Sequence, residues 1–256
     1  MKSFADKHII VTGGVKGIGR SAAEIFVREG GNVSILDVDP SGKSFEETAG
    51  GKIKFFECDM AKATSIQECI DLAIRNYGEV DVLVNNAGIN RYATVTETTE
   101  ELWDTVMNIN LKGVFLASKY SIPSMQKKGK GVVINVSSVQ AFISQSQVAA
   151  YTTSKTALLG LTRSIAVDYA PEIRCVAVCP GTINTPMLQA AIRESPNPEE
   201  VFHECEEMHL LKKVGDPTEV GEFIVYLASD KASFITGQAF RIDGGLGISI
   251  GGSKRT

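Results

Sequence analysis

Two residues with proton chemistry, Tyr151 and Lys155, lie four positions apart, a spacing that places both side chains on one face of a helix. A free tyrosine titrates near ~10 and a free lysine near ~10.4, so neither alone exchanges protons readily at neutral pH. An ammonium group fixed beside the phenol favours the phenolate, and about 4 kcal/mol of such stabilisation would bring the tyrosine pKa near ~7. The pair is therefore a candidate base for a substrate hydroxyl. The alternative is two unrelated side chains on the surface of an amphipathic helix.

A glycine-rich turn near the start of the chain is typical of a phosphate-binding site. Residues 9–11 form an apolar run, as in a strand buried on both faces, residues 12–19 carry the glycines, and residues 21–29 have a helical pattern. Glycine lets the backbone approach a pyrophosphate, and the N-terminus of the following helix presents free N–H groups. We therefore expect a nucleotide site here, with a plain tight turn as the alternative.

The acid that ends the next apolar run, Asp37, favours NAD over NADP. It closes a predicted strand at residues 33–37, about 20 residues past the glycines, where a carboxylate accepts hydrogen bonds from the adenosine ribose. The same carboxylate would repel a 2′-phosphate. Lys16 in the glycine turn is a competing signal, because its ammonium could pair with that phosphate. We expect NAD, with NADP less favoured, and a solvated acid at a strand end as the alternative for Asp37.

Strand and helix patterns alternate along the rest of the chain, which predicts an α/β fold with a parallel sheet of about seven strands and helices on both faces. The length of 256 residues suits one large domain or two small ones, and we expect one domain over residues 1–256. Further strands are predicted at residues 53–58, 81–84, 131–136, 174–179 and 238–242, and further helices at residues 63–77, 100–107 and 111–127.

Composition argues against several functional classes. A formal net charge of −4 and a pI near 5.5 give no basic surplus for nucleic-acid binding. No apolar run approaches the ~18 residues of a membrane span, and the start of the chain has no signal-peptide core. The five cysteines show no disulfide or zinc spacing, and His203 and His209 are predicted to lie on the surface, so no metal is expected. We expect a cytoplasmic protein that binds neither nucleic acid nor membrane.

Polar residues follow several of the predicted strands, at the sheet edge where ligands of such folds bind. Asp59 closes the third strand, where it could meet an adenine edge, and residues 85–88, Asn-Asn-Ala-Gly, follow the fourth. Ser138 follows the fifth strand and could hydrogen-bond the same substrate oxygen as Tyr151. Asn110 interrupts a helical pattern that asparagine disfavours, so its side chain or carbonyl could hold a water, but taken alone this residue is interpreted as structural.

These motifs occur in an order that resembles the short-chain dehydrogenase/reductase family over residues 7–245. Residues 12–19 match the family's coenzyme glycine motif, Asp59 its adenine-side aspartate, residues 85–88 its Asn-Asn-Ala-Gly, and residues 180–181 the turn over the nicotinamide. The residues that match the family's catalytic tetrad are Asn110, Ser138, Tyr151 and Lys155.

The resemblance implies a Rossmann-type doubly wound fold and hydride transfer between a substrate carbon and C4 of the nicotinamide. In that mechanism Tyr151 is the base, and Lys155 lowers its pKa and holds the nicotinamide ribose. Ser138 orients the substrate oxygen, and Asn110 holds a relay water. The coenzyme residues that the resemblance implies are Gly13, Lys16, Gly17, Ile18, Gly19, Asp37, Asp59, Asn86, Ala87, Gly88, Tyr151, Lys155, Pro180, Gly181, Thr182 and Ile183.

Assembly into a homotetramer is also implied, because the family is typically tetrameric and built on paired helices. The sequence agrees, since residues 157–167 are apolar almost all round the predicted helix, so that both of its faces need cover. Burial within one large domain is the alternative explanation of this pattern.

The substrate is expected under a flap at residues 185–214, an acid-rich segment that breaks the strand–helix rhythm. Residues 137–141 and 161–171 look most like those of archaeal NAD-dependent aldohexose dehydrogenases, which implies oxidation of a secondary or hemiacetal hydroxyl of an aldose. Polar side chains around the site suit such a substrate because buried amides need partners, although several of them could face water. The predicted substrate residues are Asn90, Ser138, Gln140, Tyr151 and Asn184.

Two other classes of function stay open. A 3-oxoacyl-thioester reductase, or a hydroxysteroid or secondary-alcohol dehydrogenase of the same family, would have a mainly apolar pocket or a preference for NADPH. A nucleotide-binding sensor without catalysis is the second class, and the complete tetrad argues against it. The sequence assigns no role to the tail at residues 248–256.

Overall fold

One sheet of seven parallel strands forms the centre of the molecule in the computed structural model, which describes residues 2–248. The strand order is β3-β2-β1-β4-β5-β6-β7, which confirms the predicted single-domain doubly wound α/β fold. Residues 249–256 of the tail lie outside the described residues. The strands are β1 (His8–Thr12), β2 (Asn32–Asp37), β3 (Ile53–Glu57), β4 (Val82–Asn85), β5 (Gly131–Val136), β6 (Ile173–Pro180) and β7 (Ala239–Ile242).

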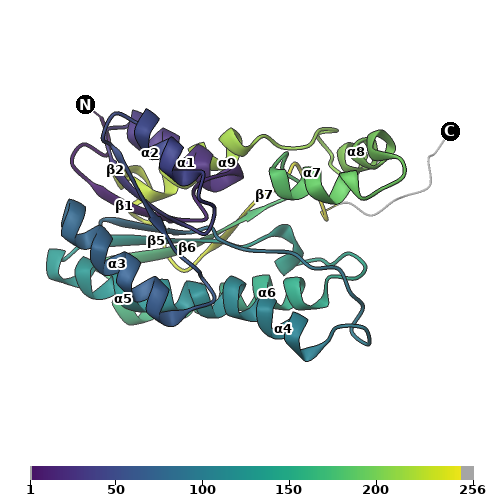
Figure 1. Ribbon diagram of the computed structural model, residues 1–256, viewed down its shortest axis with the longest axis horizontal. Coiled ribbons are helices and arrows are strands. Elements are labelled where there is room, and N and C mark those ends of the chain that lie inside the picture. Colours follow the sequence, from purple (N-terminus) through teal and green to yellow (C-terminus); the bar gives the residue numbers. More distant parts are fainter. Residues whose placement is uncertain (1, 249–256) are drawn as a thin grey trace.

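Helices cover both faces of this sheet (Figure 1). On one face α1 (Gly17–Arg28) packs against α9 (Pro217–Ala228), and on the other α3 (Ala63–Tyr77) packs against α5 (Gly113–Lys128), beside α6 (Ala149–Tyr169). No helix within residues 2–248 is both long and apolar enough to cross a bilayer. The remaining helices are α2 (Gly42–Thr48), α4 (Glu100–Met107), α7 (Pro186–Arg193) and α8 (Pro198–Glu207), with short turns at Asn108–Lys112, Val139–Ala141 and Asp230–Ala232.

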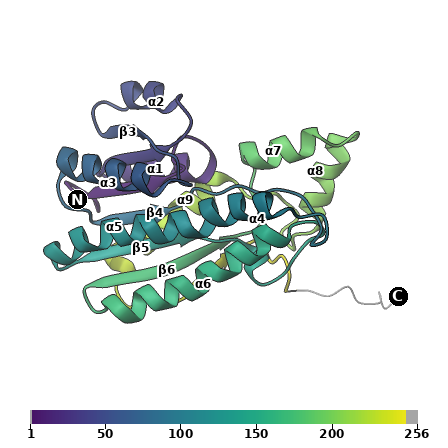
Figure 2. The same cartoon turned by 60° about the horizontal axis from the view of Figure 1, so that its bottom comes forward.

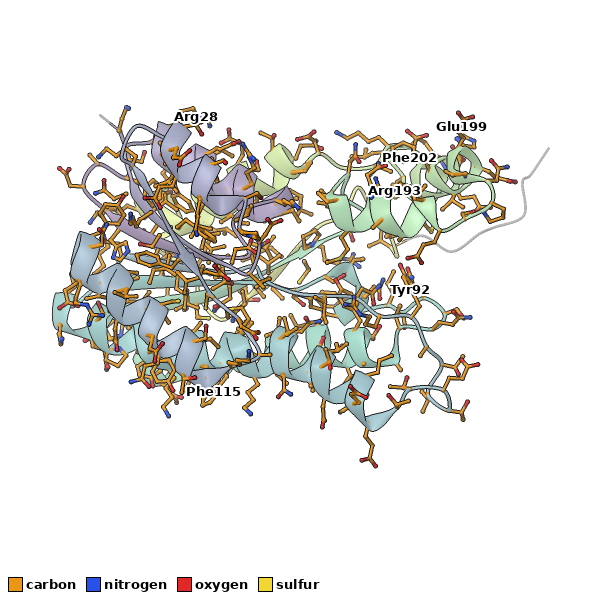
Figure 3. All side chains as sticks on the ribbon, in the orientation of Figure 1. Arg28, Tyr92, Phe115, Arg193, Glu199 and Phe202 are labelled. Atoms are coloured by element: carbon orange, nitrogen blue, oxygen red, sulfur yellow. The ribbon has the colours of Figure 1, made fainter. Side chains whose placement is uncertain are left out.

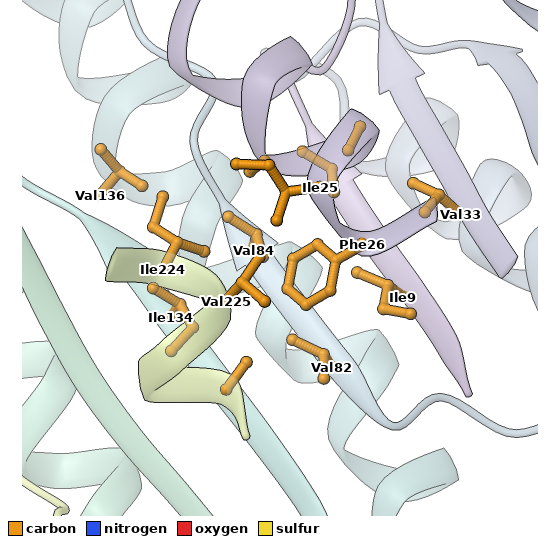
Figure 4. Close-up of a cluster of buried hydrophobic side chains, with 14 of the residues drawn as sticks. Ile9, Ile25, Phe26, Val33, Val82, Val84, Ile134, Val136, Ile224 and Val225 are labelled. Atoms are coloured by element: carbon orange, nitrogen blue, oxygen red, sulfur yellow. The ribbon is translucent and has the colours of Figure 1, made fainter. Parts of the chain in front are cut away.

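The central strands are buried on both faces because each face of the sheet carries its own apolar core. Side chains alternate along β1, so Ile9 packs with residues of α1 and α9 while Ile10 packs with residues of α3 and α5. Phe26 of α1 is fully buried within the first core (Figure 4). Truncating a buried ring of this size costs about 3–5 kcal/mol. The core therefore fixes α1, and with it the glycine turn that precedes α1.

The chain changes direction across the sheet at β1. It runs outward from β1 to β2 and β3 and then returns to β4 on the other side of β1, and in sheets of this kind a ligand crevice is expected at the carboxyl ends of the strands where the order reverses. Thr12 at the end of β1 pairs with Asn85 at the end of β4. The Thr12 hydroxyl accepts the N–H groups of Asn86 and Ala87 at 3.0 and 3.1 Å. This hydrogen bonding holds the two sides of the crevice in register.

A π-helical turn at Asn108–Lys112 joins α4 and α5 into one continuous run. Gly113 donates its N–H to the carbonyl of Asn108, five residues back, instead of four. The prediction of a new helix at residue 111 is therefore wrong at its start, because the wider turn accommodates an extra residue without ending the helix.

The predicted flap contains α7 and α8, which project beyond the end of the sheet (Figure 2). The segment begins at Thr185, whose hydroxyl caps α7 by accepting the Leu188 N–H at 3.4 Å. It returns to the sheet at Gly215, which forms a parallel bridge with Ile183. Both ends of the segment therefore lie beside the carboxyl end of β6.

Candidate active site

The glycine turn leads into α1 as predicted, and its backbone passes close to two other loops. Gly13 has a φ of +63°, and a Cβ there would lie only 2.8 Å from Ala87 Cα. A Cβ at Gly17 would lie 3.2 Å from Thr185 Cγ2 at the start of the flap. In the part of the chain that the structure describes, no side chain caps the N-terminus of α1, which follows Lys16. Its first N–H groups are therefore available to an anion, and the turn fits a pyrophosphate.

A second carboxylate, Asp39, accompanies Asp37 at the end of β2. The Asp37 carboxylate accepts the N–H groups of Val15 and Asp39, both at 3.0 Å, so it faces the glycine turn as the NAD prediction requires. Lys16 is ion-paired with Asp39 at 2.5 Å, and this hydrogen bond lowers the pKa of Asp39 to about 2. The ammonium that could have met a 2′-phosphate is therefore already paired with a carboxylate.

Asp59 and Asn86 continue the crevice beyond the glycine turn. The Asp59 carboxylate accepts the Ala61 N–H at 2.9 Å, which is the main cause of a lowered pKa for this acid. The Asn86 side chain donates to the carbonyl oxygens of Thr12 and Gly13 at 3.1 and 2.8 Å. Asn86 therefore stabilises the glycine turn from the β4 side.

Tyr151 and Ser138 approach each other from α6 and from the end of β5. Burial raises the pKa of the Tyr151 phenol, and hydrogen bonding by the Ser138 hydroxyl opposes that rise. The expected lowering of this pKa by Lys155 is not found, because the Lys155 Nζ lies 5.7 Å from the ring centre and donates to the Val136 carbonyl. Tyr92, which also raises the Tyr151 pKa, lies between α7 and the layer that contains α4 (Figure 3). The role of Tyr151 as a base stays a prediction.

Lys155 is a buried cation that has no carboxylate partner within residues 2–248. It is 4% exposed, and its Nζ donates to the Val136 carbonyl at 2.9 Å. None of the ion pairs within residues 2–248 involves it. Burial lowers its pKa from 10.5 to about 8. A Cβ at Gly88 would lie 3.2 Å from this Nζ, so glycine leaves room beside the ammonium. Such a lysine in a crevice is typical of a functional site.

Asn110 lies fully buried in the π-helical turn, and its side chain is completely hydrogen-bonded. Its Nδ2 donates to the Ile89 carbonyl at 2.9 Å and to the Ser154 hydroxyl at 3.1 Å, while its Oδ1 accepts the Ile89 N–H at 2.8 Å. Asn110 thus clamps the loop after β4 to α6. A relay water at this residue would have to use the backbone carbonyl, so the predicted role remains a prediction.

The three amide side chains predicted to meet the substrate have different surroundings. Asn90 has a buried Oδ1 that lacks a hydrogen-bond partner among the described residues. The Gln140 side chain donates to the Gln145 side chain at 3.2 Å, and Asn184 accepts from Gln189 at 2.7 Å. A buried acceptor without a partner is unfavourable unless a ligand or water fills it. Asn90 therefore fits a polar substrate better than the other two amides.

The turn after β6 is held by residues of the flap. Gly181 lies so close to the end of β7 that a Cβ there would be 2.9 Å from Asp243 Cα. The next residue, Thr182, donates its N–H to Nε2 of His209 at 3.2 Å. His209 is only 2% exposed, so its predicted surface position is wrong, whereas the His203 side chain is 70% exposed as predicted. The flap thus contacts the turn at residues 181–182, and no local pattern indicates that contact.

The predicted coenzyme and catalytic residues converge at the carboxyl edge of the sheet, on the segments that follow β1 to β6. No cluster of metal-ligating side chains occurs within residues 2–248. Sequence reasoning missed Asp39, Ser154 and His209. The spacing of Asp39, two residues after Asp37, was a usable signal because alternate residues share a side of an extended segment. Ser154 and His209 carried no such signal, since their partners are distant in sequence.

Comparison with known proteins identifies consistent relatives. Residues 13–247 match a family model described as enoyl-(acyl carrier protein) reductase. An uncharacterised oxidoreductase of Thermotoga maritima is 41% identical over 248 residues, which cover 95% of this chain and 98% of the relative. The structure of Thermoplasma acidophilum aldohexose dehydrogenase is 40% identical with a TM-score of 0.93, covering 100% of this chain and 99% of that one. A short-chain dehydrogenase/reductase of Brucella melitensis, titled glucose/ribitol dehydrogenase, is 30% identical with a TM-score of 0.88 over 98% and 100% of the two chains.

Proposed function

The chain belongs to the short-chain dehydrogenase/reductase family of oxidoreductases, which act on CH–OH groups with a nicotinamide coenzyme, and we propose that it is an NAD-dependent dehydrogenase of an aldose sugar. The observation that carries the catalytic part of this proposal is the meeting of Tyr151 and Ser138 near the buried ammonium of Lys155, which has no carboxylate partner among the described residues. These groups supply an acid–base pair and a fixed cation at one edge of the sheet.

The proposed mechanism assigns one task to each of these side chains. Ser138 binds the substrate hydroxyl and orients it toward Tyr151, which removes the hydroxyl proton. NAD supplies the hydride acceptor at C4 of its nicotinamide. Lys155 keeps a positive charge at the site, which favours the phenolate of Tyr151 once substrate excludes water. Asn110 holds the loop after β4 against α6, so that the coenzyme and catalytic groups keep their spacing.

The choice of NAD is supported by two carboxylates at the end of β2. Asp37 faces the glycine turn, and Asp39 already engages the ammonium of Lys16. A 2′-phosphate carries close to two negative charges at neutral pH. Because each repulsive unit pair near 4 Å costs roughly 4 kcal/mol at an effective dielectric of ~20, before solvent screening, NADP is disfavoured.

A polyhydroxylated substrate is supported by the buried, unpartnered Oδ1 of Asn90, which a sugar hydroxyl would satisfy. The similarity to the aldohexose dehydrogenase structure agrees with this choice. The description of the matching family model favours a second candidate, reduction of an acyl thioester. A thioester chain would leave the Asn90 oxygen unpaired, which is why the sugar is our first choice.

A substrate screen tests this proposal directly. Reduction of NAD and of NADP is followed in parallel by absorbance at about 340 nm with aldoses, secondary alcohols and steroids. The reverse reaction is assayed with 3-oxoacyl thioesters. We expect the highest kcat/KM for an aldose with NAD. Preference for a thioester with NADPH would replace the sugar assignment, and NAD binding without turnover of any compound would indicate a sensor.

The proposed assembly is a homotetramer in the cytoplasm. Val167 of α6 is 80% exposed and Phe115 of α5 is 47% exposed, and Phe115 points away from the body of the subunit (Figure 3). Exposed apolar side chains on packed helices favour contact with a second copy. Light scattering of the purified protein should therefore give about four times the subunit mass, and a monomer would remove this part of the proposal.

A further inference from the structure

His209 is a buried histidine whose two ring nitrogens are both engaged. Its Nδ1 lies 2.7 Å from the Cys205 carbonyl oxygen, and its Nε2 lies 3.2 Å from the Thr182 nitrogen. A carbonyl oxygen only accepts and an amide N–H only donates, so Nδ1 carries the proton and Nε2 is the acceptor. One neutral tautomer therefore makes both hydrogen bonds.

Two glycine turns enclose this imidazole ring. A Cβ at Gly181 would lie 3.0 Å from Nε2, and a Cβ at Gly244 would lie 3.3 Å from Cδ2. Gly244 also has a φ of +57°, which glycine adopts readily. The ring of His209 fits between these two turns because neither glycine has a side chain. Such close packing fixes the orientation of the ring.

Both backbone polar atoms of Thr182 are held from the closing end of the flap. His209 accepts the Thr182 N–H, and the N–H of Gly215, the residue that follows the flap, donates to the Thr182 carbonyl at 2.9 Å. Asn184 adds a third bond, from its N–H to the Gly215 carbonyl at 2.8 Å. The orientation of the Thr182 peptide therefore depends on how the flap returns to the sheet.

We propose that His209 is a positioning residue for the nicotinamide end of the coenzyme site. By accepting the Thr182 N–H it holds the turn at residues 180–183 and couples that turn to α8. The inference rests on the proposed function, in which this turn meets the nicotinamide. His209 acts through Thr182 and contacts no reacting atom. Loss of the acceptor leaves a buried N–H without a partner, so the turn shifts while the adenosine end keeps its own contacts.

Two probes and two variants test this assignment. ADP-ribose shares every part of NAD except the nicotinamide ring. In His209→Gln, the amide oxygen lies near the position of Nε2. In His209→Asn, the side chain is one methylene shorter than that of glutamine, so its oxygen cannot reach the Thr182 N–H. We expect the Kd of NAD to rise about tenfold in His209→Asn and less than about threefold in His209→Gln, with the Kd of ADP-ribose within about twofold of the parent in both.

His203→Asn is the matched control, because it makes the same change on the exposed side of α8 and should alter neither Kd. Equal losses for NAD and ADP-ribose would show that His209 only supports the fold. An unchanged NAD Kd in His209→Asn, or a His209→Gln variant as weak as His209→Asn, would overturn the assignment. A parent protein that binds neither probe would contradict the proposed function instead.

Amide hydrogen exchange at Thr182 provides a measurement that does not depend on a weakened variant. The Thr182 N–H should exchange slowly in the parent and in His209→Gln, because an acceptor is present in both. Fast exchange in the folded parent protein would overturn the inference even if His209→Asn does not fold.

Discussion

The two ends of the proposed coenzyme site, the adenosine end at Asp37 and the nicotinamide end at Lys155, differ in how their charged side chains are paired and buried. At the adenosine end, Lys16 and Asp39 form an ion pair whose side chains are 60% and 27% exposed, and Asp37 accepts two backbone N–H groups beside it. At the nicotinamide end, Lys155 is buried, has only a carbonyl oxygen as its hydrogen-bond partner among the described residues, and has a pKa lowered to about 8.

Under the proposed function, the charges at the adenosine end select the coenzyme, whereas those at the nicotinamide end take part in the reaction. Exposed ion pairs contribute little to stability, typically below about 1 kcal/mol, so charges at the adenosine end are free to select the coenzyme. A buried cation is destabilising unless it is paired. The proposed proton and hydride chemistry at this site would account for a buried lysine in such a place. Substitutions at the two ends should therefore have separable effects.

The largest expected effect comes from Tyr151→Phe, which changes the nicotinamide end alone. Removal of the phenol oxygen leaves the proton without an acceptor, so kcat should fall by ~10²-fold or more. The Kd of NAD should stay within about twofold of the parent, because the adenosine-end contacts persist. Steady-state kinetics and a fluorescence titration with NAD measure the two quantities. A variant that keeps more than about a tenth of the parent kcat would contradict the assigned role.

Lys155→Met should lower kcat/KM by about 10²-fold, because the ammonium serves both Tyr151 and the coenzyme. The same change should stabilise the fold. The folded-state pKa of about 8 lies below the ordinary lysine value of 10.5, so the unfolded chain binds the proton more tightly. The destabilisation, of order 3 kcal/mol, is therefore fully present below pH 8 and vanishes as the pH rises toward 10.5.

Thermal unfolding across pH measures this contribution of Lys155. The Tm of Lys155→Met should exceed that of the parent at pH 7, and the two curves should converge near pH 10.5. Curves that stay parallel, or a parent that is more stable at pH 7, would show that the ammonium is well solvated in the folded protein.

Asp37→Ser changes the adenosine end alone and should act on coenzyme choice rather than on kcat. It removes both the ribose acceptor and one repulsive charge, so the ratio of kcat/KM for NAD to that for NADP should fall by about tenfold or more. The Tyr151→Phe variant provides the contrast, since its ratio should not change. A parent that already prefers NADP, or a ratio unmoved in Asp37→Ser, would refute the NAD assignment.

Lys16→Ala should have the smallest effect, because Asp39 already neutralises this exposed ammonium. We expect kcat/KM for NAD within about threefold of the parent. Asp39→Ser should release the ammonium and raise activity with NADP by several fold, and adding Lys16→Ala should cancel that gain. A double variant that keeps the gain would mean that Asp39 repels the 2′-phosphate directly and that the ion pair has no part in selection.

Strand positions were the most predictable part of the fold. Each of the seven predicted strands overlaps an observed one, because central parallel strands are continuous apolar runs. α9 was missed although Asp216 and Glu219 form a capping box and Val220 and Ile224 supply its buried side. The sequence of residues 216–224 therefore contained a signal for this helix that the prediction did not use. α2 is only seven residues long and mostly exposed, so its sequence carries little helical pattern.

Site residues could be predicted where the residue type and the local spacing both indicate a function. Contacts between residues far apart in the sequence could not be predicted. Tyr151 and Ser138 approach each other, since Ser138 follows β5 and Tyr151 lies near the start of α6, whereas the Lys155 ammonium donates to the Val136 carbonyl. The burial of His209 depends on Gly181 and Gly244, which the local sequence around residue 209 does not indicate. The sequence also did not predict that the pKa of Tyr151 is raised. Burial of the phenol depends on how several loops pack, and its effect on this pKa exceeds that of the Ser138 hydroxyl.

The packing of α9 on α1 has a consequence for how the protein is made. The apolar face of α1 leaves the ribosome early, but Val220, Ile224 and Val225, which cover part of it, are synthesised near the end of the chain. Contacts between segments so far apart slow folding and leave apolar surface open to aggregation. We expect nascent chains to need chaperone protection until residue 228 has emerged. Part of the apolar face of α1 therefore stays uncovered until α9 has been synthesised.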